Sequence, residues 1–338
     1  MEPLRIGLLG AARISDIAVI QPAHQTGARL VAVAARDRDR AETFASLHGI
    51  ERVLDGYQAV IDDPEVEVVY NPLANALHAP WNLRAIAGGK HVLSEKPYAS
   101  NAEEARLVRD AASAAGVHCV EAFHYRYHPV MGRMLELAGD GEIGDVVSVE
   151  ARMLMPPPAA GDLRWDASVA GGGLMDVGCY AVHAIRDVAT LMGGSPSIVG
   201  ARGGEIPEHP GVDAWLDADL ELPNGAPARL ASGMTHGVLD FSLRIVGTKG
   251  EAYAPGFVLP HTDDRVIVTV GTGQRVEELG TRLSYAYMLE ALSRLLREGE
   301  PMLTDADDAV VTMQLIDDLY RAAGMQPRTA ITIDGPEA

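Results

Sequence analysis

The sequence predicts an α/β protein built from two domains, a doubly wound parallel sheet followed by an α+β domain. Over the first 120 residues, short β-type runs alternate with helical patterns, which is typical of parallel strands joined by helical crossovers. In the second half, strand-like runs lie close together, and the Pro-Asn-Gly and Gly-Thr-Lys-Gly signals between them are typical of antiparallel hairpins. We therefore predict domains at residues 1–123 and 124–338.

In the first domain, short β-type runs bounded by turn residues predict the strands. These strands are Leu4–Leu9, Leu30–Ala35, Val66–Tyr70, His91–Ser94 and Val117–Ala122. Helical patterns lie between them, at Arg38–His48 and Asn101–Ala115 among others. Ser100 with Glu103 has the spacing of a capping box at the start of the second helix.

The second domain mixes helical and strand patterns without the regular alternation of the first. The predicted helices are Val130–Ala138, Leu174–Leu191, Ser284–Glu298 and Asp305–Ala323, the last capped by Thr304. The predicted strands are Ser197–Arg202, Ala214–Leu222, Ala228–Thr235, Phe241–Val246 and Arg265–Val270.

Composition and charge exclude several classes of protein. A chain of 338 residues with 47% hydrophobic content can build two cores, so disorder is excluded as its main state. With 28 basic and 47 acidic residues the net charge is −19, which repels phosphate backbones and anionic lipid, and we expect no nucleic-acid partner. The longest stretch without a charged residue, Val68–Leu83, is interrupted by Asn, His and Pro and predicts no membrane span. The apolar strand leaves no room ahead of Ile6 for an export signal, so we expect a cytoplasmic protein.

Patterns that bind metals are weak in this chain. Cys119 and Cys179 are too few for a metal cage or a disulfide framework, and we expect both to be buried apolar residues. His124 and His128 lie four residues apart, but they lack an acid at suitable spacing, and Pro129 interrupts the helix that would align them. We expect no metal.

The turn after the first strand contains part of a dinucleotide fingerprint. The full pattern has glycine at positions 10, 12 and 15, and here only Gly10 is present. That glycine allows the tight turn that points a helix N-terminus at a pyrophosphate, while Ala12 and Ser15 are small enough for close approach. The place of this turn in the alternating pattern favours a nucleotide loop over an ordinary strand-helix turn.

The residue that follows the second strand of such a fold reads the ribose of the nucleotide. A carboxylate there accepts hydrogen bonds from the 2′-hydroxyl of NAD and repels a 2′-phosphate. In this chain the strand is followed by Arg36, backed by Arg38 and Arg40, and a guanidinium pairs with a 2′-phosphate. The pattern favours NADP, and Asp37 leaves NAD open as the alternative.

Two further loops follow strands of the first domain. One begins at Asn71 and runs to His78, and the other contains Glu95 and Lys96. Ligands of doubly wound sheets bind beyond the carboxyl ends of the strands, so both loops can line one crevice. Lys96 is one of three lysines among 28 basic residues, and lysine can lose its proton on burial whereas arginine cannot. From the residues alone, Lys96 is either a proton-transfer group or the partner of Glu95 in a surface ion pair.

Three segments carry a family resemblance. They are residues 7–14, Glu95-Lys96-Pro97, and the run Gly-Gly-Gly-Leu-Met-Asp-Val-Gly-Cys-Tyr at 171–180. With them the chain resembles, over nearly its whole length, the glucose-fructose oxidoreductase/inositol dehydrogenase/rhizopine catabolism (Gfo/Idh/MocA) family. The resemblance implies an NAD(P)-dependent oxidoreductase with a Rossmann domain, a C-terminal α+β domain on an open, mainly antiparallel sheet, and a homodimer or homotetramer formed through that sheet.

The resemblance also implies roles for individual residues. Lys96 matches the catalytic lysine of the Glu-Lys-Pro motif, and Asp176 matches the acid of the second motif. Tyr180 stands where many members carry a catalytic histidine. A tyrosine there is similar to the branch of glucose-fructose oxidoreductase, dimeric dihydrodiol dehydrogenase and xylose dehydrogenase, which often uses NADP. His124 departs from that branch, in which an apolar residue such as methionine is expected, and this difference bears on substrate shape.

The residues themselves support a substrate site in the second domain. Asp176 and Tyr180 are four apart and face the same way on a helix, so a carboxylate and a phenol can converge on one substrate. His183 is three residues beyond Tyr180 and lies near the same face of the helix, where it is either a substrate contact or a histidine of the core. Phe123, Tyr125 and Tyr127, spaced by two, predict a ring-lined face of an extended segment that walls a pocket or packs the domains together. Arg164 and Trp165 either contact a polyol or belong to a structural ion pair.

These arguments define the candidate site residues. The cofactor-binding set is Gly10, Ala11, Ala12, Arg13, Ile14, Arg36, Asn71, Leu73, Asn75, His78, Glu95 and Lys96. The catalytic set is Lys96, Tyr180 and Asp176. The substrate-binding set is Lys96, Tyr125, Arg164, Trp165, Asp176, Tyr180 and His183.

The sequence thus predicts an NADP-preferring oxidoreductase that moves a hydride between nicotinamide and a CH–OH or C=O group of a small carbohydrate, polyol or cyclic diol. Lys96 and Tyr180 would handle the hydroxyl proton, and Asp176 would orient the substrate. Three alternatives stay open. They are a ketoreductase of nucleotide-linked sugars, a non-catalytic nucleotide-binding regulator, and an enzyme that recycles a tightly bound cofactor between two sugars.

Overall fold

The computed structural model describes residues 2–333 and divides the chain into two compact units. The first unit contains residues 2–123, 285–313 and 329–333, and the second contains 124–284 and 314–328. The first break follows Phe123, where the sequence suggests a boundary. Residues 285–313, which the sequence assigns to the second domain, return to the first unit.

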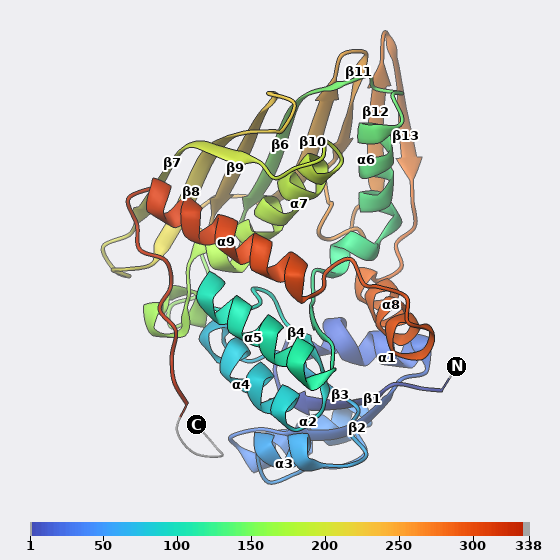
Figure 1. The fold of residues 1–338 in the computed structure, drawn as a ribbon, viewed down its shortest axis with the longest axis vertical. Coiled ribbons are helices and arrows are strands. Elements are labelled where there is room, and N and C mark those ends of the chain that lie inside the picture. Colours follow the sequence, from blue (N-terminus) through green and yellow to red (C-terminus); the bar gives the residue numbers. More distant parts are fainter. Residues whose placement is uncertain (1, 334–338) are drawn as a thin grey trace. The chain divides into compact units, whose positions relative to one another are not determined.

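Within the described residues, five parallel strands form the sheet of the first unit in the order β2-β1-β3-β4-β5 (Figure 1). The strands are β1 (Arg5–Leu9), β2 (Arg29–Ala34), β3 (Val68–Asn71), β4 (His91–Ser94) and β5 (Cys119–Glu121). β2 pairs with one side of β1 and β3 with the other, so the strand order reverses at β1, the point at which sheets of this kind bind ligands beyond their carboxyl ends. The predicted doubly wound parallel sheet is confirmed.

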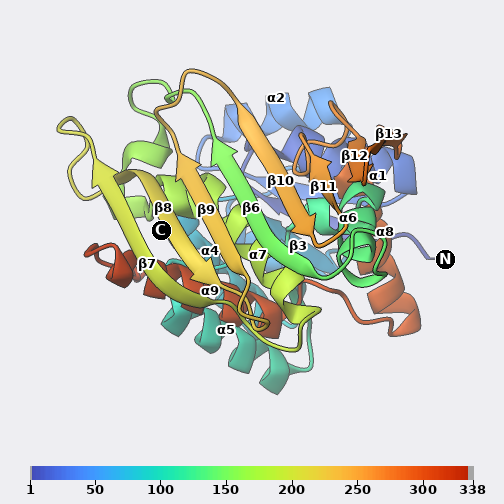
Figure 2. The same cartoon turned by 90° about the horizontal axis from the view of Figure 1, so that it is seen from above.

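Helices cover both faces of the sheet, and all but α8, which follows β13, lie between its strands in the chain. They are the π-helical turn η1 (Asp16–Ile20), α1 (Gln21–Thr26), α2 (Arg38–His48), α3 (Tyr57–Asp62), α4 (Asn75–Ala87), α5 (Ala102–Ala115) and α8 (Ser284–Glu298). α4 and α5 lie on one face and α1 on the other (Figures 1 and 2). Ile6 and Leu8 of β1 are fully buried between these layers, and burial of each such side chain contributes about 1.5–3 kcal/mol.

The cap of α5 differs from the prediction by one residue. The side chain of Asn101, not that of Ser100, accepts the hydrogen bond that caps the helix, from the backbone N–H of Glu104 at 3.0 Å. Glu104, not Glu103, then reaches back to the N–H of Ser100 at 2.9 Å. The reciprocal pairing of a capping box is therefore present but shifted, because Asn101 is the last residue with extended backbone dihedrals.

The last helix, α9 (Ala306–Ala322), also begins differently from the prediction. Thr304 does not cap it, since its hydroxyl donates to the carbonyl of Glu121 at 2.7 Å. The carboxylate of Asp305 instead accepts from the N–H of Asp308 at 2.9 Å. The buried threonine thus ties the end of β5 to the segment before α9.

In the part of the second unit that the structure describes, eight strands form a mixed, mainly antiparallel sheet in the order β13-β12-β11-β10-β6-β9-β8-β7 (Figure 2). β6 and β9 run parallel, and the other neighbours pair antiparallel. The strands are β6 (Val146–Leu154), β7 (Ser197–Glu205), β8 (Asp213–Glu221), β9 (Pro227–Gly233), β10 (Asp240–Gly247), β11 (Gly250–Ala254), β12 (Arg265–Val270) and β13 (Gly273–Glu278). The open, mainly antiparallel sheet is confirmed.

Three of these strands, β6, β11 and β13, were not predicted from the sequence, and β6 lies in the middle of this sheet. Alternation of buried Val149, Ala151 and Met153 with less buried neighbours is the signal that could have found it. α6 (Pro129–Gly139) and α7 (Cys179–Thr190) pack on the sheet. Short helical turns complete the unit, at His124–Tyr127, Leu163–Trp165, Ala167–Val169 and, as a π-helical turn before α7, Leu174–Gly178.

The predicted extended segment with rings at every second residue is wrong. His124–Tyr127 forms a 3-10 turn, whose side chains do not alternate between two faces. Within it Tyr125 is fully buried and packs edge-on against Tyr180 and Phe257, with ring centroids 5.7 and 5.3 Å apart. Pro129 at the start of α6 favours the extended residue before it and limits this short turn.

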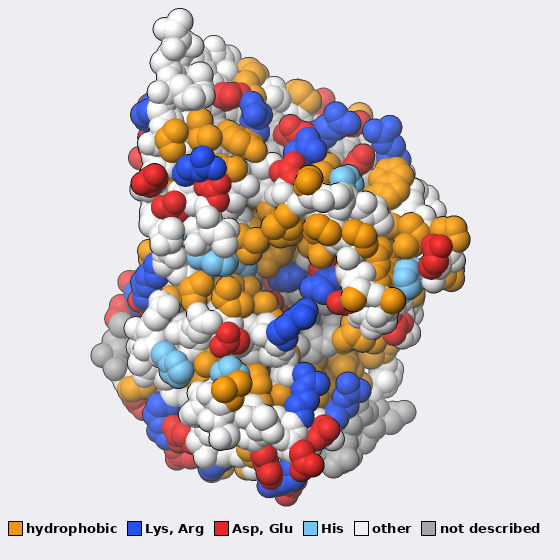
Figure 3. Space-filling model, turned by 180° about the vertical axis from the view of Figure 1, so that it is seen from behind, with side chains coloured by type: hydrophobic (Ala, Val, Ile, Leu, Met, Phe, Trp, Pro, Cys, Tyr) orange, Lys and Arg blue, Asp and Glu red, His pale blue; other side chains and the backbone are white. Residues whose placement is uncertain are grey.

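The surface carries both signs of charge. Figure 3 shows acidic and basic side chains interspersed over one face of the molecule.

Among the described helices, none has the length and apolar content needed to cross a membrane. The two cysteines, Cys119 and Cys179, are buried as expected.

Candidate active site

The first strand-helix turn of the first unit has the geometry of a nucleotide loop. Gly10 has φ +92°, a left-handed conformation that favours glycine, and its N–H bonds to the carbonyl of Ala34 at 2.7 Å. A Cβ at this position would lie 3.3 Å from the side chain of Leu73, so glycine also keeps this approach open. Arg13 and Ile14 are exposed just before η1 begins, so backbone N–H groups at this helix start lie close to the surface.

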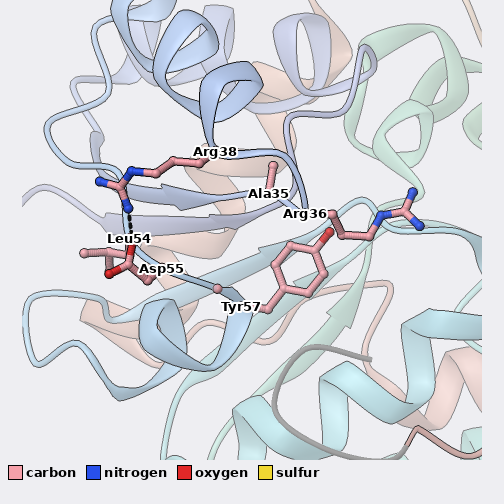
Figure 4. Close-up of a pocket in the computed structure, with 7 residues that line it drawn as sticks. Ala35, Arg36, Arg38, Leu54, Asp55 and Tyr57 are labelled. Atoms are coloured by element: carbon pink, nitrogen blue, oxygen red, sulfur yellow. Dashed lines mark hydrogen bonds and ion pairs between the residues drawn. The ribbon is translucent and has the colours of Figure 1, made fainter.

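A pocket of about 370 Å³ lies at the carboxyl end of β2. It is lined by Ala35, Arg36, Arg38, Leu54, Asp55, Gly56 and Tyr57. Figure 4 shows Arg36 and Arg38 extending in opposite directions from the chain after β2. Arg36 is exposed, and within residues 2–333 its guanidinium makes no hydrogen bond or ion pair, so it is available to an anion.

The neighbours of Arg36 are already engaged, which differs from the expected cluster of three arginines. Arg38 pairs with Asp55 and with Glu42, the latter at 2.9 Å. Arg40 donates to the carbonyl of Ala11 at 2.7 Å and so ties α2 to the nucleotide loop.

Asp37, the acid that left NAD as the alternative cofactor, has a structural role. The carboxylate of Asp37 accepts a hydrogen bond from the N–H of Arg40 at 3.0 Å and caps α2. Burial raises the pKa of nearby Tyr57, and the positive charges of Arg36 and Arg40 partly oppose this. The pocket therefore presents arginine, while the neighbouring carboxylate holds a helix N-terminus.

The loop after β3 is held by its own polar side chains. Asn71 is fully buried, and its amide donates to the carbonyl of His78 at 3.1 Å and to Asn82 at 2.8 Å. Leu73 and Asn75 are half-buried, and Asn75 is the first residue of α4. Of the three polar residues of this loop predicted to contact the cofactor, Asn71 and His78 are buried and hold the loop through hydrogen bonds within it.

His78 connects this loop to the Glu-Lys-Pro loop. Its Nδ1 lies 2.7 Å from the carbonyl oxygen of Pro97, and its Nε2 lies 2.9 Å from that of Leu73. Burial, with a smaller contribution from the charge of Lys96, lowers the pKa of His78 to about 4, although the contacts with the carbonyls of Pro97 and Leu73 oppose this. The neutral imidazole donates to one of these two carbonyls and contacts the other, and so lies between the two loops that the sequence predicts along one crevice.

Lys96 follows β4 and is half-buried. Its backbone N–H lies 3.3 Å from the carboxylate of Glu95, which also accepts from the hydroxyl of Tyr70 at 2.9 Å. The peptide bond between Lys96 and Pro97 is cis. Glu95 is buried, and its carboxylate holds the loop through Tyr70 and the backbone N–H of Lys96. The side chain of Lys96 therefore starts from a backbone position that this loop holds in place.

Tyr180 lies in a group of buried aromatic and polar side chains in the second unit. Its hydroxyl is 3.3 Å from Nε2 of His124. Tyr125 and His183, both fully buried, contact each other through the phenol oxygen and Nδ1 at 2.6 Å. Asp187 lies 3.6 Å from the same Nδ1. The polar atoms of Tyr125 and His183 therefore satisfy each other, while Tyr180 carries its hydroxyl on the first turn of α7.

Asp176 lies in the π-helical turn before α7, and its carboxylate is held by Arg164 at 2.5 Å. Arg164 also pairs with Asp162 at 3.1 Å. Trp165 is buried, stacks on His209 with centroids 4.7 Å apart, and donates its indole N–H to a backbone carbonyl. Arg164 therefore belongs to an ion pair, and contact of Arg164 or Trp165 with a polyol stays a prediction.

The sequence analysis missed a buried ion pair that supports this helix. Asp213 accepts from the N–H of Leu174 at 2.7 Å and from the hydroxyl of Tyr320 at 2.8 Å, and it pairs with Arg328. Gly172 has φ +138°, and a Cβ there would lie 2.0 Å from the Asp213 carboxylate. The partners are distant in sequence, so no local pattern marks them.

The residues predicted to be catalytic come from both units. Lys96 belongs to the first unit, and Asp176 and Tyr180 belong to the second. Within residues 2–333, no group of three or more His, Cys, Asp and Glu residues is arranged to hold a metal ion.

Comparisons with known proteins agree with this architecture. Residues 4–123 match the oxidoreductase family with an NAD-binding Rossmann fold, and residues 131–253 match the GFO/IDH/MocA C-terminal domain. The chain is 36% identical over 323 residues to D-xylose 1-dehydrogenase (NADP(+)) 2 of Haloferax volcanii, covering 95% of this chain and 97% of that protein. It is 29% identical over 343 residues to trans-1,2-dihydrobenzene-1,2-diol dehydrogenase of Xenopus laevis, with 95% and 98% covered.

A solved structure matches both units. It is a 3-ketoreductase from Actinomadura kijaniata in complex with NADP and TDP-benzene, with a TM-score of 0.88, 27% identity, and 95% of this chain and 98% of that chain covered. Both units therefore resemble proteins of one family, and the loops after β1 and β4 agree with that family. The chain belongs to the Gfo/Idh/MocA family of NAD(P)-binding oxidoreductases.

Proposed function

We propose that this enzyme uses NADP to oxidise a hydroxyl, or reduce the matching carbonyl, of a small sugar, polyol or cyclic diol. The observation that carries the cofactor choice is the pocket at the end of β2, in which Arg36 is available while Asp37 is used as a helix cap. The D-xylose dehydrogenase relative, named for NADP, and the dihydrodiol dehydrogenase relative support the choice of cofactor and substrate class.

The residues present fit the nucleotide. Gly10 supplies a backbone that no side chain obstructs, and the helix that follows supplies free N–H groups for the pyrophosphate. Arg36 would bind the 2′-phosphate, and the loops around Leu73 and Lys96 would contact the nicotinamide half. The cofactor, when bound, accepts or donates the hydride.

The protein groups handle the proton. In oxidation the hydroxyl O–H bond breaks, Lys96 takes the proton as a neutral amine, and the carbon releases its hydride as the C=O bond forms. Tyr180 hydrogen-bonds to the reacting oxygen, and Asp176, held by Arg164, orients a second hydroxyl of the substrate. In reduction the same groups return the proton to the new alkoxide.

A ketoreductase acting on a nucleotide-linked sugar is the second candidate, because the solved 3-ketoreductase with TDP-benzene shares the fold of both units. The net charge of −19 repels a diphosphate-linked substrate more than a neutral sugar, so this candidate requires a basic group at the substrate site, as Arg36 supplies at the cofactor pocket. Turnover of a nucleotide-linked keto sugar without turnover of free sugars or diols would select this candidate.

We further propose a homodimer or homotetramer formed through the second sheet, whose strands face the viewer in Figure 2. Residues paired directly across neighbouring strands form one row over this sheet, in which acidic and basic side chains alternate and are followed by apolar ones. A second copy related by a two-fold axis would place charges of opposite sign against this row. The row is Asp219, Arg229, Glu150, Arg244, Tyr253, Ile267 and Val276. Light scattering after gel filtration tests this state, with R229E expected to weaken it. A cytoplasmic location stays a prediction of the sequence.

The first experiment is a thermal-shift titration with NADP⁺, NADPH, NAD⁺ and NADH. A ligand that binds only the folded state raises stability by RT ln(1 + [L]/Kd), which is about 2.7 kcal/mol at a hundredfold excess over Kd. We expect the phosphorylated pair to give the larger shift, followed by turnover in a screen of aldoses, polyols and dihydrodiols. Absence of a shift with all four nucleotides would overturn the proposed function.

A further inference from the structure

A polar contact chain runs through the imidazole of His124 in the second unit. His124 Nδ1 lies 2.7 Å from the hydroxyl oxygen of Ser284, and Nε2 lies 3.3 Å from that of Tyr180. The rings of His124 and Tyr180 meet edge-on, with centroids 5.9 Å apart. Both ring nitrogens of a residue that is only 1% exposed therefore contact hydroxyl groups.

The position of His124 in the chain makes this contact unusual. His124 and Ser284 are the first and last residues of the long segment of the second unit, 160 residues apart. The sequence resemblance predicts an apolar residue such as methionine at position 124, which could make neither contact. In this chain a hydrogen-bonding side chain, His124, therefore contacts the hydroxyl of Tyr180, the tyrosine that we propose to act on the substrate.

The hydrogen-bonding capacity of imidazole explains what this arrangement can do. A neutral ring has one donor and one acceptor, so the partner of one nitrogen selects the role of the other. If Ser284 donates to Nδ1, Nε2 carries the proton and donates to the phenol oxygen of Tyr180. The O–H of Tyr180 is then directed away from His124, as donation to a reacting oxygen requires.

We propose that His124, with its tautomer set by Ser284, is a positioning residue for Tyr180 in the reaction of this enzyme. The inference rests on the proposed role of Tyr180. His124 acts through the phenol and does not itself touch the substrate. No proton leaves or enters through His124 in this scheme, because its Nε2–H stays donated to Tyr180.

The test compares kcat and KM of wild type with those of H124M, H124Q, Y180F and the double variant H124M/Y180F. H124M removes both ring contacts and replaces the imidazole with an apolar side chain of similar length. H124Q keeps an amide N–H that can donate to the phenol oxygen. We expect H124M to lower kcat about tenfold or more with little change in KM for NADP(H), and H124Q to recover most of that loss.

The double variant separates positioning from general damage. In Y180F there is no hydroxyl to position, so we expect H124M to add less than about a twofold further loss there. S284A should lower kcat less than H124M, because it leaves the ring in place but no longer selects its tautomer. Thermal unfolding and the NADPH-induced shift are measured for every variant to confirm that each is folded.

The contrary outcomes are distinct. The inference is overturned if H124M keeps more than half of kcat, if its loss is the same in the Y180F background, or if H124Q is as impaired as H124M while still folded. If H124M does not fold, H124A, which also removes both ring contacts, takes its place, and wild-type kcat in folded H124A would overturn the inference. A Y180F variant with wild-type kcat overturns the role of Tyr180 and the inference with it, whereas loss in Y180F without loss in the folded His124 variants overturns the inference alone.

Discussion

Nε of Arg164 lies 2.5 Å from the carboxylate of Asp176, and Nη1 of the same guanidinium lies 3.1 Å from Asp162. Burial lowers the pKa of Arg164, but the charge and hydrogen bond of Asp176, with those of Asp162, raise it on balance. The carboxylate that we propose to orient the substrate is therefore fixed in direction by an arginine from a neighbouring turn, not only by its own helix.

Replacing Arg164 with methionine tests this relationship. We expect kcat/KM for the substrate to fall about tenfold or more, because Asp176 loses a charge-assisted hydrogen bond of about 1.5–3 kcal/mol that fixes its direction. R202M, which removes an exposed arginine 3.9 Å from its acidic partner, is the matched control and should behave as wild type. Steady-state kinetics check both, and an unchanged kcat/KM in R164M would show that Asp176 needs no such support.

Lys96→Met should abolish turnover and spare nucleotide binding. Removing the proposed proton-transfer group lowers kcat by about 10²–10⁴-fold, a range typical of general acid–base catalysis. The NADPH-induced thermal shift should stay close to that of wild type. K249M, at an exposed lysine whose amine donates to the carbonyl of Gly141, serves as the control. Retention of most of kcat in K96M would remove lysine from the mechanism.

Arg36→Ala should change cofactor preference. Loss of a guanidinium–phosphate contact worth about 1.5–3 kcal/mol predicts a drop of roughly 10–100-fold in kcat/KM for NADP and little change for NAD. Arg38 lines the same pocket but is paired with Asp55 and Glu42, so R38A should have a much smaller effect. Equal losses in the two variants would assign the preference to the general positive charge of the pocket.

The ion pair between Glu67 and Arg297 should stabilise the first unit in a pH-dependent way. It is bidentate, with N–O distances of 2.6 and 2.7 Å, and the side chains are each 16% exposed. The hydrogen bond from Arg297 lowers the pKa of Glu67 from its ordinary value of 4.5, although burial opposes this. We expect E67Q to lower the free energy of unfolding by about 1–2 kcal/mol at neutral pH.

The sign of the pH effect follows from the direction of that shift. A carboxyl group whose pKa is lowered on folding stabilises the protein above its unfolded pKa, and this contribution disappears as pH falls through the folded pKa. The difference between wild type and E67Q should thus be full at pH 7 and shrink below about pH 4.5. E65Q, at a carboxylate that is 52% exposed and 3.9 Å from Arg29, is the control in chemical denaturation. A difference that is independent of pH would contradict the assignment.

Local patterns in the sequence were enough to predict the first sheet. Each of its strands is a short apolar run followed by turn residues, so β1 to β5 fall close to their predicted bounds. The loops after β1 and β4 were found for the same reason, since a parallel sheet places functional loops directly after strands. β6 was missed although Val149, Ala151 and Met153 alternate with polar residues, because its partners β9 and β10 are distant in sequence and form no hairpin with it.

The sequence by itself determined which residue types follow each strand, and hence the family and the class of chemistry. Only the tertiary structure decided how those residues are used. Arg36 and Arg38 look alike in sequence, yet only Arg38 meets Asp55, and His124 meets Ser284 across 160 residues. Periodicity reports interactions over a few neighbouring residues, whereas such pairings depend on where the chain returns after long excursions, and that is decided by the packing of whole elements.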